Sequence, residues 1–111
     1  MKLLEEDEIG ELCHALNLPI DVVRTACPDE GVVGEIEQFT FIGWMLAQER
    51  RVGGHGIDVS LLSRDQAKAT RIPYSAMAYS TDGSPAIDTV MSARGPAVSV
   101  ALAIIAAWQT H

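Results

Sequence analysis

The side chains of this chain best suited to catalysis or metal binding are three histidines and two cysteines. They are His14, His55 and His111, with Cys13 and Cys27. Protein zinc sites bring such ligands together in short, recurring spacings, which these five residues do not show. Both cysteines fall within helix-like patterns of a core-rich chain, where they are expected to be buried as small apolar side chains. The pattern therefore favours free thiols over a disulfide and predicts no metal site.

A second candidate for chemistry is the segment 53–56, Gly-Gly-His-Gly, which has the composition of a flexible active-site loop. A catalytic histidine needs a partner group within reach, and no second histidine or paired carboxylate is evident nearby. Glycines that follow a helix are also explained as its C-cap, because they adopt left-handed backbone. The chain lacks a phosphate-binding glycine loop and the Gly-x-Ser-x-Gly motif of hydrolases. We therefore expect a non-enzymatic protein with no catalytic residues and no cofactor.

Residues 29–40 are spaced like a calcium-binding loop that begins at Asp29. Calcium requires oxygen ligands at the third and fifth positions and a bidentate acid at the twelfth. Those three positions hold Gly31, Val33 and Thr40. The sequence thus predicts no calcium site. The segment 18–46 nonetheless resembles an EH domain, an EF-hand relative that binds short peptides, and peptide binding by residues 9–47 is left open.

Charge is distributed unevenly along the chain. Residues 1–40 hold ten acids and two bases, a net charge of −8, whereas the other 71 residues hold five acids and six bases, a net charge of +1. Such an acidic half repels phosphate, which disfavours nucleic acid as a direct partner. Residues 12–26 have the spacing of a helix-turn-helix, but Arg24 would be the only base on its second helix. The acids suit a basic surface of a partner protein better.

We expect seven of these acids to form the partner-binding surface. They are Glu5, Glu8 and Glu11 on one face of the first helix, and Asp29, Glu30, Glu35 and Glu37 around the turn that follows. The alternative is that the acids serve only to keep the protein in solution. Binding to a basic partner predicts a strong dependence on salt, whereas a solubility role does not.

Length and composition indicate one compact domain over residues 1–111. With 48% hydrophobic residues the chain can bury a real core and does not have the composition of a disordered protein. The N-terminus lacks the apolar region of a signal peptide. The longest apolar run, near the C-terminus, is about 13 residues, which is shorter than the ~20 needed to cross a bilayer. We expect a cytoplasmic protein with no membrane partner.

Hydrophobic periodicity places these residues in an α+β fold. A period near 3.6 residues predicts helices through 5–16, 20–27, 35–51 and 96–108. Alternation of apolar and polar residues predicts strands through 57–62, 74–80 and 86–92, the last two joined by a hairpin turn. Residues 63–71 are polar and are expected to form a loop or one helical turn. The fold expected is a small antiparallel three-stranded sheet packed with three to four helices, in the order α-α-α-β-β-β-α.

The last predicted helix, residues 96–108, is apolar on almost every side, with Ser99 as its one polar residue. Such a helix must be covered on most sides, so we expect it and the helix through 35–51 to carry the core. Ser99, Ala103 and Ala106 form a face of small residues that would let another backbone come close. We expect a homodimer or a partner contact near this face.

Two stretches of the chain resemble the small phage proteins of the ABA-sandwich and NinX families. They are residues 7–18, a helix of the kind Asp-Glu-Ile-Gly-Glu-Leu-Cys-His-Ala-Leu-Asn-Leu, and residues 93–107, an alanine-rich and aliphatic helix that starts through Gly-Pro. The resemblance implies a virus-encoded accessory protein of α+β fold, from a family without an active site to carry over. Small acidic phage proteins of this size often bind host proteins, including components of defence complexes; this last step is an analogy.

These observations favour a non-enzymatic phage or mobile-element protein that binds and inhibits a host protein, of the anti-CRISPR or another counter-defence type. One alternative is a small-ligand binder or sponge for a nucleotide-like molecule, with its pocket between the sheet and residues 39–46. A second alternative is a structural oligomer with no separate ligand.

Overall fold

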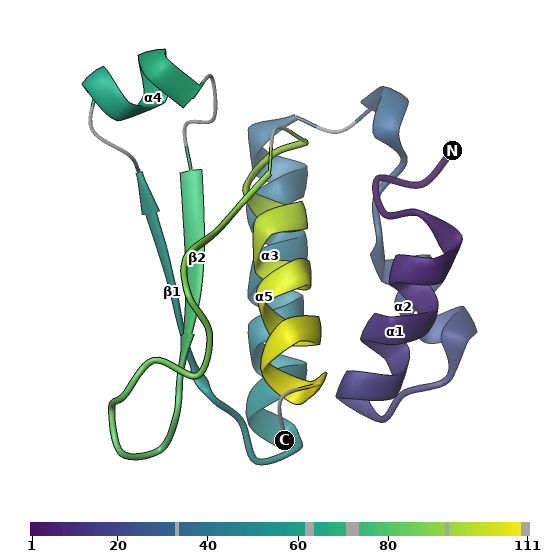
Figure 1. Ribbon diagram of the computed structural model, residues 1–111. Helices are drawn as coiled ribbons and strands as arrows, with labels where there is room; N and C mark the ends of the chain where they lie inside the picture. The colour runs from purple at the N-terminus through teal and green to yellow at the C-terminus, as the bar shows by residue number, and fades with distance from the viewer. Residues whose placement is uncertain (33, 62–63, 71–73, 93, 110–111) are drawn as a thin grey trace.

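The elements of the fold occur in the expected order, with one short helix added between the first two strands. The computed structural model describes residues 1–32, 34–61, 64–70, 74–92 and 94–109, so the expectations that concern Val33, Leu62 and His111 fall outside the described residues. Figure 1 labels the five α-helices of the described residues and the two longer strands, β1 and β2. The elements are α1 (Glu6–Leu16), α2 (Ile20–Ala26), the 3-10 turn η1 (Glu30–Val32), α3 (Glu35–Arg51), β1 (Gly56–Leu61), α4 (Arg64–Thr70), β2 (Tyr74–Tyr79), β3 (Val90–Met91) and α5 (Pro96–Gln109).

Helix α5 is the central element of the fold, as its composition predicts. It packs beside α3, with the sheet on one side and α1 on the other. Figure 1 shows the resulting three layers: the sheet, then α3 with α5, then α1 with α2. Ten of the fourteen residues of α5 are buried, and full burial of each large aliphatic side chain is worth about 1.5–3 kcal/mol. The burial of this one helix therefore holds the three layers together.

The sheet is antiparallel, in the order β1-β2-β3. Strand β3 is much shorter than the expected strand through 86–92, because only Val90 and Met91 pair with β2. The chain approaches β2 once earlier, where Tyr79 forms an isolated bridge with Pro85. Pro85 has no N–H to donate, and the N–H groups of Ala86 and Ile87 both point to one acceptor, the carbonyl oxygen of Ala78, so the regular ladder does not continue here. The edge of the sheet is therefore mostly loop.

The apolar periodicity of the sequence predicts only some of the buried residues in the helical layers. In α1 the expected residues Ile9, Leu12 and Leu16 are fully buried. In α3, which was expected to carry the core together with α5, Phe41 and Met45 are buried, but Phe39 and Ile36 are exposed. The reason is that α3 packs mainly on α5, so only one side of it is covered. Among the described residues, no helix is long and apolar enough to cross a membrane.

Candidate functional site

Six of the seven acids expected at the surface are exposed. Glu5 caps α1 and Glu11 lies on that helix, Asp29 and Glu30 lie at η1, and Glu35 and Glu37 lie in the first turn of α3. All six therefore belong to the outer helical layer, to η1 or to the start of α3. The sheet contributes none of them.

Glu8 does not belong to this surface, and its expected role as a surface acid is wrong. The carboxylate is buried because the guanidinium of Arg94, which precedes α5, binds both of its oxygens, at 2.8 and 2.5 Å. The backbone N–H of Glu5 also donates to it, at 2.8 Å. Hydrogen bonds from Arg94 lower the pKa of Glu8, outweighing the opposite effect of its burial. This ion pair joins α1 to the start of α5.

Few bases neutralise the acids of residues 1–40. Lys2 approaches Asp29 at 3.7 Å, and Arg24 binds Glu6 at 2.8 Å and Asp21 at 3.1 Å. Within the part of the chain that the structure describes, six of the acids have no ion pair: Glu5, Asp7, Glu11, Glu30, Glu35 and Glu37. This part of the surface therefore keeps an excess of negative charge.

The face of small residues on α5 lies inside the core and not at a free surface. Ser99 and Ala103 are fully buried within one chain, and Ala106 is half-buried. The Ser99 hydroxyl donates to the carbonyl oxygen of Gly95, at 3.2 Å, so it needs no partner from another chain. Another backbone could reach Ser99 or Ala103 only after α5 had been unpacked. The expected dimer or partner contact at these two residues is therefore corrected: a single chain already covers them.

An apolar groove, which sequence reasoning missed, runs between α2 and α3. Two adjoining hollows, of about 350 and 550 Å³, share Ala26 and Trp44. The first is completed by Pro28, Ile36, Glu37, Thr40 and Phe41, and the second by Asp21, Val22 and Thr25. The rings of Trp44 and Phe41 stack, with centroids 6.1 Å apart. Trp44 packs against the core with part of its surface and lines the groove with the rest. Periodicity shows that a face of a helix is apolar but not whether another element covers it.

A buried carboxylate forms a second cluster at the other end of α3. Glu49 is only 1% exposed and accepts a hydrogen bond from the indole N–H of Trp108, at 2.8 Å. The backbone N–H of His55 donates to both its oxygens, at 2.7 and 3.0 Å, and the Nδ1 atom of His55 lies 3.3 Å from Oε2. Gly54 must be small here, because a Cβ atom would lie 2.6 Å from Oε1 of Glu49. The carboxylate thus links α3, the segment before β1, and α5.

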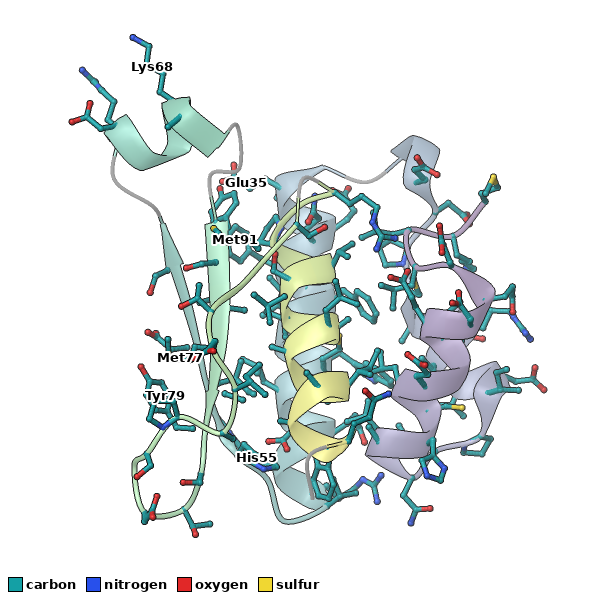
Figure 2. The ribbon with its side chains drawn as sticks, in the orientation of Figure 1. Glu35, His55, Lys68, Met77, Tyr79 and Met91 are labelled. Carbon is teal, nitrogen blue, oxygen red and sulfur yellow. The ribbon has the colours of Figure 1, made fainter. Side chains whose placement is uncertain are left out.

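This cluster corrects the conclusion that His55 has no carboxylate partner. Glu49 was missed because it belongs to the preceding helix and not to the loop. A signal existed, since Glu49 follows Ile42 and Met45 on the buried face of α3, where an acid needs a partner. Figure 2 shows His55 where the lower ends of α3 and α5 come together.

The cluster borders a hollow of about 230 Å³. Gly53, Gly54, His55, Ser80, Thr81 and Trp108 line it. The edge of one ring faces the other in the contact between His55 and Trp108, at 5.3 Å. The Ser80 hydroxyl lies within hydrogen-bond distance of the Asp82 carboxylate and of the carbonyl oxygen of Ser84, which holds it in the turn that follows β2. The arrangement can hold a small ligand against two fixed rings.

Neither cysteine takes part in these sites, and both are free thiols. Cys27 is fully buried, which raises its pKa and keeps it in the thiol form. No group of three or more metal-binding side chains comes together among the residues that the structure describes. Protein-family models give no match to the chain, and no curated protein and no solved structure matches it significantly.

Proposed function

We propose that this protein works by binding a partner protein through the exposed acids of α1, η1 and the first turn of α3, without catalysing a reaction. The observation that supports this most strongly is the uncompensated charge: these acids are exposed, and six acids of residues 1–40 have no ion pair within the described residues. A surface kept this acidic attracts a basic protein surface and speeds its association. It repels the phosphates of nucleic acids.

The more specific part of the proposal is that a phage or mobile element encodes the protein and that its partner is a host defence protein, such as a CRISPR effector. The resemblance to NinX-type accessory proteins supports the first point. The charge supports the second, because proteins that handle nucleic acids carry basic surfaces, and an acidic protein can cover them. Binding of this kind would inhibit the host protein by occlusion.

The test compares two sets of charge reversals. The triple variant Glu5→Lys, Glu11→Lys and Glu35→Lys changes exposed acids that make no ion pair and leaves the Glu8–Arg94 pair intact. The control reverses the same number of exposed acids in the other half of the chain: Asp58→Lys, Asp65→Lys and Asp88→Lys. Partner capture from host lysate is measured at about 0.05 and 0.5 M salt, where screening lengths differ several-fold.

We expect the first variant to lose the partner and the control to keep it, with wild-type capture strongest at low salt. The two variants carry the same net charge, so a general effect of charge on solubility would change both alike. Equal capture by both variants would refute the proposal. For a defence protein, the same pair of variants is compared in an assay of phage survival.

A second candidate function is the binding of a small, nucleotide-like ligand, which the hollow beside the Glu49 cluster supports. The hollow is not where the sequence analysis expected a pocket, since it lies at the ends of α3 and α5 and not along residues 39–46. Its two fixed rings suit a planar ligand. Mass spectrometry of the protein purified without dialysis tests this, and a ligand whose binding survives Trp108→Ala would argue against the hollow.

A further inference from the structure

We propose that the groove between α2 and α3 binds an amphipathic helix of the partner, with apolar side chains on one face and Lys or Arg beside them. The inference rests on the proposed function and names the element of the partner that docks. Its first support is the apolar surface left uncovered there. Ile36 is 80% exposed and Val22 43% exposed, and both line the hollows. Isolated exposed apolar residues are ordinary, but these line one groove and so offer a partner a contiguous apolar surface.

The shape of the groove fits a helix. The two hollows, of about 350 and 550 Å³, meet at Trp44 and Ala26, so together they follow α2 and α3 as one channel between two helices. A helix lies in such a channel through apolar residues spaced three and four apart. The half-buried ring of Trp44 stacks on the buried ring of Phe41, which holds it as a rigid surface for these anchors. Large aromatic residues dominate the binding energy of many interfaces.

The charges at the groove select a basic helix. Asp21 lies on its α2 side and Glu37 on its α3 side. Glu37 also accepts a hydrogen bond from the backbone N–H of Gly34, at 2.9 Å, which keeps the carboxylate in place. Arg24 is the base of α2, and it is bound to Glu6 and Asp21. Asp21 is thus already paired, so Lys and Arg beside the anchors would meet an acid without an ion pair among the described residues on the α3 side, at Glu37.

A second copy of the chain is a poor occupant of the groove. The chain has a formal net charge of −7, and two copies meeting here would bring the same acids together. Charge of like sign at an interface is unfavourable. A partner of opposite charge meets no such repulsion.

The first experiment uses two synthetic peptides of about 18 residues, which form helices of about 27 Å. Both carry leucine at the anchor positions; one has Lys at the other positions and the second has Glu. Binding is followed by the NMR signals of the two indole N–H groups. We expect the Lys peptide to shift the Trp44 signal saturably, with little change at Trp108, which does not line the groove. The Glu peptide should bind at least about tenfold more weakly. Equal binding of both peptides, or shifts at Trp108 alone, would overturn the inference.

Four single variants then locate the contact. Ile36→Asp removes an apolar contact in the exposed first turn of α3, where the helix dipole tolerates an acid. The lost contact should outweigh the attraction of the added acid for Lys and weaken binding of the Lys peptide several-fold. The control, Met91→Asp, changes an exposed apolar residue on β3 and should have no effect. Glu37→Gln keeps an oxygen for the Gly34 N–H but removes the charge, so it should weaken binding of the Lys peptide and reduce the salt dependence of that binding. Its control, Asp65→Asn, removes an exposed charge on α4 and should change neither. Unchanged binding by Ile36→Asp would overturn the inference.

The outcomes separate this inference from the proposed function. If Ile36→Asp captures the partner as the wild type does, while the triple Lys variant does not, the acids act without the groove and only the inference fails. If Ile36→Asp loses the partner while the triple Lys variant captures it normally, the groove is supported and the acidic surface is refuted. If sedimentation shows a wild-type dimer that Ile36→Asp dissociates, the occupant is a second copy and the inference is overturned.

Discussion

Replacing Glu49 with leucine tests whether the buried carboxylate holds the lower end of the molecule together. Leucine is close in size and suits an apolar interior, so the change removes hydrogen bonds and leaves no large cavity. Two buried donors would lose their acceptor: the indole N–H of Trp108 and the backbone N–H of His55, which now lie 2.7–2.8 Å from the carboxylate oxygens. The Nδ1 atom of His55 would lose a further contact at 3.3 Å.

The magnitude follows from these donors. Each buried donor left without an acceptor costs about 1–3 kcal/mol, so two of them cost roughly 2–6 kcal/mol. The substitution by leucine offsets part of this loss of stability, because burying a carboxylate is itself unfavourable. We expect a net loss of about 2–4 kcal/mol, out of a total unfolding free energy of about 5–15 kcal/mol for a domain of this kind. The melting temperature should fall by at least about 8 °C.

Urea unfolding followed by circular dichroism measures this loss, and hydrogen exchange of the His55 amide reports it locally. The matched control is Glu11→Leu, which removes an exposed acid of α1 and should change stability by less than about 0.5 kcal/mol. A Glu49→Leu variant within about 0.5 kcal/mol of the wild type, with its His55 amide still protected, would show that the carboxylate does not hold α3, the 53–55 segment and α5 together.

Three further predictions follow from burial and charge. Because Arg94 lowers the folded-state pKa of Glu8 below its ordinary value of 4.5, the pair stabilises the fold fully above that value and stops doing so as pH falls through the folded-state pKa; acid unfolding of Glu8→Gln should therefore depend less steeply on pH, and an unchanged slope would contradict this. Cys27 should react with a thiol reagent only as the protein unfolds, since burial raises its pKa, whereas labelling of Cys27 in the native protein as fast as in urea would show that it is accessible. Ala103→Glu should prevent folding, because it places an unpaired charge in a fully buried position of α5; a folded variant that sediments as a monomer would place this residue outside the core.

The residues of the acidic surface show how well the exposure of a charged side chain can be predicted from sequence. Charged side chains are exposed unless an ion pair or hydrogen bonds compensate for the loss of water. Six of the seven predicted acids accordingly lie at the surface. Glu8 is the exception because its partner, Arg94, is 86 positions away in the chain. No local pattern contains that pair. The hydrogen bond between Glu49 and Trp108 could not be predicted for the same reason, since the two residues are 59 positions apart.

The sequence by itself determined the order of the elements, the antiparallel α+β class and the central position of α5. Local periodicity decides these features, and an apolar helix has nowhere stable to lie in water except the core. Only the tertiary structure decided which apolar faces stay uncovered and which charged groups meet. Ile36 and Trp44 belong to α3, whose apolar residues predict a core helix. Both nevertheless line a groove, because α2 and α3 leave space between them. Coverage depends on how elements are arranged in three dimensions, which the spacing of residues within one element does not specify.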